Sequence, residues 1–182
     1  MKILRLDVSG QPTNWLCTED AISLIAKNHV VWSLGDRCER VFGGTNRMGE
    51  RSYLDVPPII ASAGAQKSRG LIPPLNNRSL FRRDCNLCLY CGDWFDDSKL
   101  TRDHVHPRCQ GGPDLWENVV SACSRCNGSK GGRTPEQAGM PLLAVPFVPN
   151  PFESLYLVNR NILSDQMKYL RSGFGSLRDW AA

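Results

Sequence analysis

Two pairs of cysteines with the spacing Cys-x-x-Cys bracket a group of acid, imidazole and amide side chains in the middle of the chain. The cysteine pairs are Cys88/Cys91 and Cys123/Cys126. The polar residues between or directly after them are Asp103, His104, Asn118 and Asn127. Zn²⁺ prefers thiolate and imidazole ligands in a tetrahedron, and two such knuckles present four thiolates. The spacing therefore predicts a closed, structural zinc site that contributes folding energy.

A fifth cysteine, Cys85, allows two choices for the first cysteine pair. Cys85 and Cys88 have the same spacing as Cys88 and Cys91. Gly92 follows Cys91 directly, and the turn of a knuckle commonly needs a residue that tolerates positive φ. We therefore favour Cys88 and Cys91 as the first half of the zinc site.

The adjacent Asp103 and His104 bring a carboxylate beside an imidazole. Hydrolysis of a phosphodiester needs a base for water, a Lewis acid on the scissile phosphate and stabilisation of the leaving oxygen. His104 suits the first need because imidazole titrates near neutrality. Asp103 and Asn127 offer hard oxygen ligands, which suit Mg²⁺ or Mn²⁺. A general base supplies only about 3 to 5 kcal/mol, so metal charge and orientation must supply most of the rest.

Positive charge gathers on both sides of this group of residues. The chain of 182 residues has a formal net charge of only +4, but residues 67–84 hold five cations and one acid, and residues 123–133 hold three cations and no acid. Such flanks predict contact with a polyanion such as nucleic acid, with a solvated basic surface as the alternative. The cations assigned to nucleic acid are Arg82, Arg83, Arg125, Lys130 and Arg133.

The N-terminal part of the chain predicts a lobe distinct from this group of residues, within one compact protein. Residues 1–63 predict a small α+β lobe, because apolar runs near 3–8, 30–32 and 53–56 are β-like and a capped helix begins near residue 18. Residues 64–79 carry Gly, Pro, Asn and cations without a clear period. This composition predicts an exposed basic connector.

The rest of the chain divides into the segment with the chemistry and a C-terminal tail. Residues 80–140 contain both cysteine pairs and the polar group. Residues 141–182 begin with a Pro-rich segment, which favours an extended chain. Apolar residues then recur at helical spacing and predict one helix over about 154–171 that packs on the body.

Two further features bear on location. No window approaches the ~20 apolar residues that span a bilayer, and the first twenty residues lack an apolar signal region. We therefore expect a soluble, cytoplasmic protein without membrane contact. Reduced thiols are normal in that compartment, which favours metal binding over disulfides for the eight cysteines.

Three stretches of the sequence resemble the zinc-containing HNH endonucleases of bacteria and their phages. They are FRRDCNLCLYCG, LTRDHVHPRCQGGPDLWENVV and SACSRCNGSKGGRTPEQAG. The resemblance is specific over about residues 80–140. It implies an α+β protein with a ββα-metal core, in which a β-hairpin carries Asp103 and His104, a loop carries Asn118, a helix carries Asn127, and zinc buttresses the unit.

The same resemblance implies a role for each polar residue. His104 would be the general base, and Asp103 a ligand of the catalytic Mg²⁺ or Mn²⁺. Asn118 would hold the hairpin and orient His104. Asn127 stands where the family has a final His or Asn, and would complete the catalytic metal site. His106 would be a third metal ligand, a phosphate contact or a packing residue.

The leading hypothesis is a metal-dependent endonuclease in a bacterial or phage-infected cell, with duplex DNA as its substrate; a homodimer is compatible with the sequence. Arg125 and Lys130, on or near the helix of the motif, would contact phosphate oxygens. One alternative is a non-catalytic zinc-ribbon module that binds nucleic acid, which would have no use for the paired Asp103 and His104. Another is an RNA-directed nuclease, although the sequence contains no recognised RNA-binding module.

Overall fold

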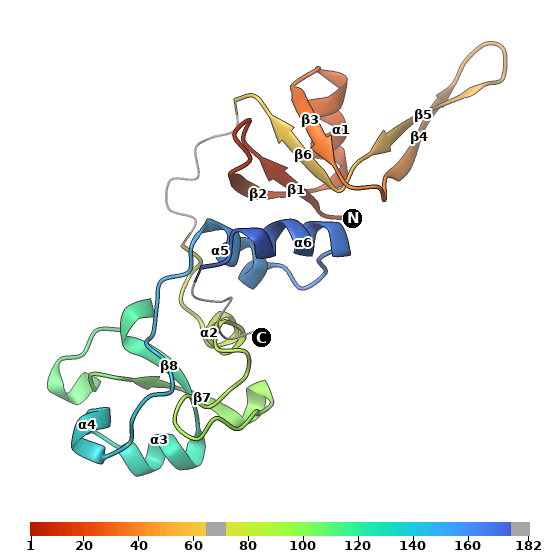
Figure 1. Cartoon of the computed structure of the whole chain (residues 1–182). Helices are drawn as coiled ribbons and strands as arrows, with labels where there is room; N and C mark the ends of the chain where they lie inside the picture. Colours follow the sequence, from red (N-terminus) through yellow and green to blue (C-terminus); the bar gives the residue numbers. More distant parts are fainter. Residues whose placement is uncertain (65–71, 176–182) are drawn as a thin grey trace. The chain divides into compact units, whose positions relative to one another are not determined.

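The computed structural model of the chain describes residues 1–64 and 72–175 (Figure 1). The chain forms two compact units, one from residues 1–71 and 151–173 and the other from residues 72–150 and 174–182. Both mix short helices with small sheets, which confirms the predicted α+β class. In the described part of the chain, no helix has the length and apolar character that crossing a membrane requires.

A four-stranded sheet forms the centre of the first unit, with the order β2-β1-β6-β3. Its strands are β1 (Ile3–Leu6), β2 (Pro12–Leu16), β3 (Val30–Leu34) and β6 (Ile59–Ser62). Helix α1 (Thr18–Ala26) is capped by Cys17, whose sulfur accepts a hydrogen bond from the Asp20 amide. Buried side chains of β1, β2, α1 and β6, together with Val56 just before β6, form the core: Ile3, Leu16, Ala21, Val56 and Ile60.

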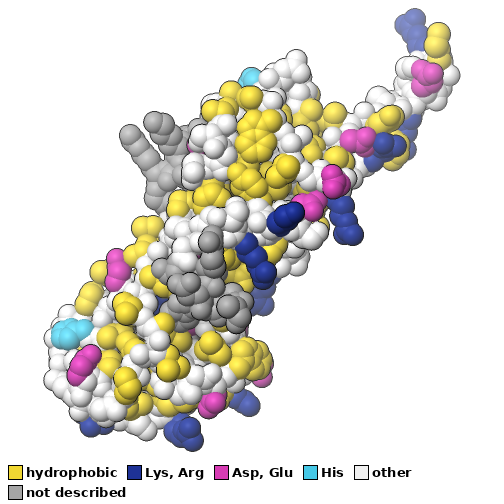
Figure 2. Space-filling view, viewed as in Figure 1, with side chains coloured by type: hydrophobic (Ala, Val, Ile, Leu, Met, Phe, Trp, Pro, Cys, Tyr) yellow, Lys and Arg dark blue, Asp and Glu magenta, His cyan; other side chains and the backbone are white. Residues whose placement is uncertain are grey.

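A separate hairpin extends from this unit. It consists of β4 (Glu39–Thr45) and β5 (Arg51–Val56), which form a two-stranded sheet of their own. Figure 2 shows cations, acids and hydrophobic side chains side by side along the hairpin and at its end. The Arg40 guanidinium lies 4.2 Å from the centre of the Tyr53 ring and also pairs with Asp55 at 2.7 Å. The hairpin therefore carries a mixed surface whose charges are partly paired among themselves.

Two helices, α5 (Pro151–Val158) and α6 (Ser164–Ser172), occupy the place of the single helix predicted over 154–171. That prediction is wrong because side chains end one helix and begin the next. The Asn159 side chain accepts from the Asn161 amide at 3.2 Å, and Gln166 accepts from the Leu163 amide at 3.0 Å. Gln166 also donates to backbone oxygens of Lys2 and Pro58, both at 2.8 Å, so α6 is fixed to the sheet of its own unit.

The predicted connector over 64–79 is only partly described, because residues 65–71 lie outside the described residues. Its last residues already belong to helix α2 (Asn77–Arg83). The Asn76 side chain accepts from the Ser79 amide at 2.9 Å and caps the helix. The extended stretch therefore ends earlier than predicted, because a side-chain cap starts a helix within it.

The second unit contains a hairpin followed by a helix, which is the predicted ββα order. Strands β7 (Leu100–His104) and β8 (Val119–Cys123) are antiparallel, and helix α3 (Ser124–Lys130) follows β8 directly. Asp103 pairs with Val120 and His104 with Val119. Short helical turns and a small helix complete the unit: η1 (Asp97–Lys99), η2 (Arg108–Gln110), η3 (Trp116–Asn118) and α4 (Pro135–Ala138).

Arg83 is fully buried in this unit, which corrects its predicted role as a nucleic-acid contact. Its guanidinium pairs with Asp84 at 2.7 Å and donates to the backbone oxygens of Trp116, Val119 and Phe147 at 2.8–3.0 Å. Asp84 accepts from the Ser121 amide at 2.7 Å. A buried charge is tolerated when it is paired and hydrogen-bonded, as it is here. Arg83 therefore ties α2 to the strand and turn that carry the site.

Candidate active site

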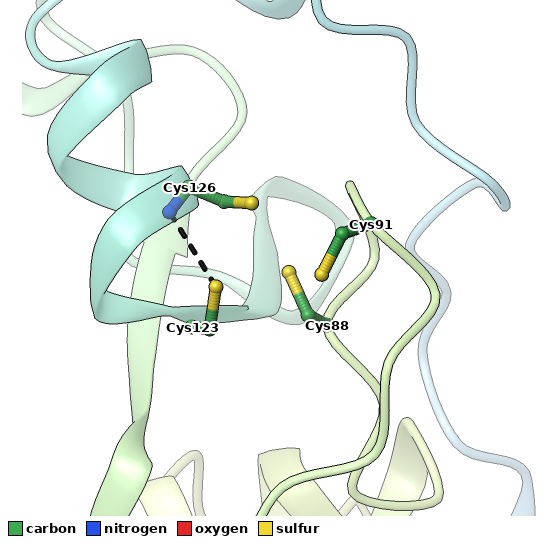
Figure 3. A group of neighbouring side chains, drawn as sticks. All are labelled: Cys88, Cys91, Cys123 and Cys126. Carbon is green, nitrogen blue, oxygen red and sulfur yellow. Dashed lines mark hydrogen bonds between the residues drawn. The ribbon is translucent and has the colours of Figure 1, made fainter.

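The four cysteines of the two predicted pairs lie together (Figure 3). Cys88 and Cys91 come from the turn after α2, and Cys123 and Cys126 come from the end of β8 and the first turn of α3. Their sulfur atoms all lie within 4.8 Å of one another. Tetrahedral Zn²⁺ with bonds of about 2.3 Å separates its sulfur ligands by about 3.8 Å, so this thiolate cluster can hold zinc.

Local backbone geometry shapes the thiolate cluster. Gly92 adopts φ 78°, the positive value expected for the turn after Cys91. Cys85 is not a member of the cluster. Burial raises the pKa of the Cys91 thiol to about 11, with a smaller contribution from its hydrogen bond to Cys88. Thiols that hold their protons in this way bind a cation in competition with protons, which makes zinc affinity depend on pH.

Asp103 lies on β7 with only 4% of its surface exposed. One carboxylate oxygen accepts from the Tyr90 hydroxyl at 2.5 Å, and the other lies 3.0 Å from the Lys130 ammonium. Burial, and then the bond to Asp103, raises the pKa of the Tyr90 phenol far above its usual range. Sequence reasoning missed Tyr90, although its place inside the first Cys-x-x-Cys pair puts it beside the predicted site.

Lys130 is buried beneath the site, with 1% of its surface exposed. Its ammonium donates to the backbone oxygens of His104 and Arg133, both at 3.0 Å, and pairs with Asp103. A longer contact of 3.5 Å runs to the Gly131 oxygen, so the three protons of the ammonium are all directed to protein oxygens. The predicted role of Lys130 as a phosphate contact is therefore corrected. It is a buried cation that joins the end of α3 to β7.

His104 faces a carboxylate that sequence reasoning did not assign. Its Nε2 lies 2.9 Å from Oδ1 of Asp114. Nη1 of Arg102 donates to both oxygens of the same carboxylate, at 2.9 and 2.7 Å. Arg102, and then His104, lowers the pKa of Asp114. The charged carboxylate is thus favoured beside the imidazole, where it can fix the ring and its tautomer.

Asn118 fastens the loop that follows β7. Its side chain accepts from the His106 amide at 2.8 Å and donates to the backbone oxygens of His106 and Pro113, at 3.0 and 2.7 Å. The loop closes tightly here, since a Cβ on Gly112 would lie 1.7 Å from the His106 oxygen. Asn118 therefore reaches the backbone just after His104 and does not contact the imidazole itself.

Asn127 lies on α3 and turns its amide nitrogen towards β7. That nitrogen donates to the Thr101 hydroxyl at 2.8 Å. Within residues 1–64 and 72–175, no hydrogen bond to the carbonyl oxygen of Asn127 is recorded, so this oxygen can act as a cation ligand. Asp103, His104 and Asn127 line one pocket of about 230 Å³, hereafter the Asp-His-Asn pocket.

The remaining predicted residues lie at or outside the edge of this pocket. His106 is exposed and does not line it. Arg125 is exposed and lines a different hollow with Lys99. Arg133 is exposed, and its guanidinium donates to backbone oxygens at the end of α3. Arg82 is half-buried on α2. Arg108, which sequence reasoning passed over, is an exposed cation that lines the Asp-His-Asn pocket.

Comparison with known proteins adds independent information. The family model of HNH endonucleases matches residues 88–143. The CRISPR-associated endonuclease Cas9 of Corynebacterium diphtheriae is 44% identical over 55 residues, which are 30% of this chain and 5% of that protein. The crystal structure of the Type II-C Cas9 enzyme from Actinomyces naeslundii aligns with a TM-score of 0.32 and 21% identity, covering 58% of this chain and 12% of that one.

The chain therefore spans only a small part of the length of these relatives. The segment matched by the family model contains the thiolate cluster and every residue of the Asp-His-Asn pocket. Residues 88–143 accordingly belong to the HNH endonuclease family, and the chain carries an HNH endonuclease domain.

Proposed function

We propose that this protein is a metal-dependent endonuclease that hydrolyses phosphodiester bonds in duplex DNA. The observation that carries the proposal is the Asp-His-Asn pocket, in which a carboxylate, an imidazole and an amide oxygen converge beside a cluster suited to zinc. A binding module needs the cluster and the cations but not this pocket. The reduced thiols fit a cytoplasmic setting in a bacterial or phage-infected cell.

The two groups of ligands differ in the cation that they suit. Four thiolates suit Zn²⁺, and a site closed by four protein ligands is structural. The Asp103 carboxylate and the Asn127 carbonyl oxygen are hard ligands that suit Mg²⁺ or Mn²⁺. When bound, such a cation supplies positive charge beside the scissile phosphate and the leaving oxygen. Asp103 and Asn127 come from neighbouring elements, β7 and α3, and both residues line the same pocket.

His104 acts as the general base in this proposal. A ring nitrogen takes a proton from the attacking water, while the new bond forms between the water oxygen and phosphorus and the leaving oxygen departs. Asp114, held by Arg102, steadies the imidazole and favours the positive charge that it gains. Asn118 fixes the backbone immediately after His104. Together these contacts hold the base in place before the substrate arrives.

Exposed cations around the domain offer contacts for the DNA backbone. Arg108 lines the Asp-His-Asn pocket, and Arg125 projects from α3, the helix that carries Asn127. Arg82 and Arg133 remain proposed contacts on the same unit. Contacts to phosphate position a protein without specifying a base sequence, so we expect cleavage with little sequence preference from this domain.

The direct test compares His104→Ala with the unchanged protein on plasmid DNA in Mg²⁺ or Mn²⁺. We expect cleavage to fall by at least ~10²-fold, because positioned proton transfer contributes that much, while zinc content stays the same. His29→Ala is the matched control, since His29 is exposed and lies in the first unit. Equal cleavage by His104→Ala and the unchanged protein would defeat the proposal.

The choice of nucleic acid has its own test. The same pocket could hydrolyse RNA, so DNA and RNA duplexes of one sequence should be compared at equal concentration. We expect faster cleavage of DNA. Faster cleavage of RNA would make RNA the substrate and leave the proposed hydrolysis of phosphodiester bonds unchanged. No cleavage of either duplex would support a non-catalytic binding module.

A further inference from the structure

Tyr90 belongs to two sites at once. It lies between Cys88 and Cys91, and its ring packs against the core formed around the thiolate cluster. Its hydroxyl leaves that core and donates to the Asp103 carboxylate at 2.5 Å. From this juxtaposition we propose that Tyr90 is a positioning residue that couples the zinc-binding turn to the carboxylate that binds the catalytic cation. The proposal rests on the metal-dependent function proposed above.

The backbone around Tyr90 is held firmly in place. Gly92 donates to the Cys88 oxygen at 2.8 Å, and Cys88 donates to the Asp93 oxygen at 2.9 Å. Leu89 donates to the Ser121 oxygen at 2.9 Å, which joins this turn to β8. Since β8 pairs with the strand that carries Asp103, the turn and the carboxylate share one frame. A cation bound by the four thiolates would hold the cysteine turn against the end of β8 more firmly.

The Tyr90 hydroxyl limits how the carboxylate can turn. Asp103 is held at one oxygen by Tyr90 and at the other by Lys130. Each carboxylate oxygen has two lone pairs, so one on each remains for a cation in the Asp-His-Asn pocket. Partners that hold a metal ligand in this way fix its orientation, and their loss typically lowers metal affinity about 10- to 100-fold.

The alternative is that the hydroxyl only satisfies a buried carboxylate and has no bearing on the cation. The two roles differ in what they predict for metal affinity. A hydroxyl that merely fills space contributes to folding stability alone. A positioning hydroxyl changes the affinity for the cation even when the protein stays folded and keeps its zinc.

Tyr90→Phe removes the hydroxyl and keeps the ring that packs on the cluster. The full-length, zinc-loaded protein should be titrated with Mn²⁺ without DNA, and free Mn²⁺ followed by its electron paramagnetic resonance signal. Tyr169→Phe is the matched control, because it removes a tyrosine hydroxyl that donates to the Gly10 oxygen at 2.7 Å in the other unit. Asp103→Asn shows how far the Mn²⁺ affinity depends on the carboxylate itself.

We expect Tyr90→Phe to weaken Mn²⁺ binding by about 10- to 100-fold with zinc content unchanged, and Tyr169→Phe to bind Mn²⁺ normally. Plasmid cleavage by Tyr90→Phe should recover when Mn²⁺ is raised to saturation. Normal Mn²⁺ affinity in Tyr90→Phe, together with lost affinity in Asp103→Asn, would overturn this inference and leave the proposed function standing. Normal affinity in Asp103→Asn would overturn both.

Loss of zinc from Tyr90→Phe is the remaining outcome. It would show that the hydroxyl maintains the cysteine turn itself, and it would also overturn the inference. Zinc should therefore be measured by atomic absorption on the same samples that are titrated with Mn²⁺.

Discussion

The thiolate cluster and the Asp-His-Asn pocket lie in one unit of the protein but are built in opposite ways. The cluster consists of four identical soft ligands within 4.8 Å of one another, three of them buried. The pocket combines a carboxylate, an imidazole and an amide around about 230 Å³ of open space. A metal site closed by four protein ligands stabilises a fold, whereas catalysis needs a position left open for substrate. The difference fits the proposal that one site holds the frame and the other does the chemistry.

The two sites also differ in how their side chains are held. Each cysteine pair is positioned by a single local turn, with ligands three residues apart in sequence. The residues of the pocket are positioned by partners from distant segments. Asp103 is held by Tyr90 and Lys130, and His104 faces Asp114. Local geometry therefore sets the spacing within each cysteine pair, although the fold must still bring the two pairs together, as the bond from the Leu89 amide to the Ser121 oxygen does. In the pocket, even the individual side chains depend on partners from distant segments.

The largest expected effect comes from breaking the cluster. Cys123→Ser should remove zinc and unfold the second unit, because structural zinc contributes on the order of 10 to 16 kcal/mol, as much as the whole stability of a typical domain. Circular dichroism and zinc analysis measure both losses. Cys85→Ser is the control, since Cys85 lies outside the cluster. A Cys123→Ser protein that stayed folded with full zinc content would contradict a structural role for the cluster.

An intermediate effect is expected from loosening the pocket without touching the cluster. Asn118→Ala removes three hydrogen bonds to the backbone of His106 and Pro113. These bonds are partly buried and each contributes about 0.5 to 1.5 kcal/mol, so we expect a loss of about 2 kcal/mol of unfolding free energy. Cleavage should also fall, because the loop after His104 is released, while zinc is retained.

Asn76→Ala serves as the control for this variant. It removes the cap of α2 and should cost about 1 kcal/mol without lowering cleavage in the folded protein. Urea denaturation and plasmid cleavage on the same preparations separate the two effects. If both variants lowered cleavage in proportion to their loss of stability, Asn118 would have no specific role in the pocket.

The smallest effect is expected at the rim of the pocket. The pKa of Asp114 is lowered from its ordinary value of 3.8, first by Arg102, so folding favours the charged carboxylate. Above pH 3.8, the Asp114→Asn variant should therefore be less stable than the unchanged protein. This difference should disappear only as the pH falls through the folded pKa of Asp114. The side chain is 43% exposed, so solvent screening limits the loss to less than about 1 kcal/mol.

Denaturation of the Asp114→Asn variant and the unchanged protein from about pH 9 to about pH 7.5 checks this sign, because an ordinary imidazole is neutral over that range and the difference between the two proteins should stay constant. A difference that shrank between those values would mean that another titrating group controls the pair.

Much of the candidate site could be predicted because its information is local. The Cys-x-x-Cys spacing places two thiols on one turn wherever the chain goes, and the positive φ of Gly92 follows from the same turn. The hairpin and helix that carry Asp103 and Asn127 were predicted differently, as what the resemblance to the HNH endonucleases implies. The break between α5 and α6 was not, because it depends on the polar side chains Asn159 and Gln166 interrupting an otherwise helical apolar pattern.

The cations show most clearly where sequence reasoning fails. Arg83 and Arg82 are neighbours of the same type, yet Arg83 is fully buried and Arg82 is half-buried. Lys130 and Arg125 lie on one helix, but only Arg125 is exposed. Charge in a sequence indicates a surface only on average, since a buried cation is stable when the fold supplies a carboxylate and backbone oxygens for every proton.

The amino-acid sequence by itself determined the composition of the two sites, because ligand type and short spacing choose the chemistry that a segment can support. Tertiary structure alone decided which charges face solvent and which partners hold Asp103 and His104. The physical reason is that the contacts of Asp103 with Tyr90 and Lys130, and of His104 with Asp114, join residues 10 to 27 positions apart. Only the folded chain brings such residues within reach of one another.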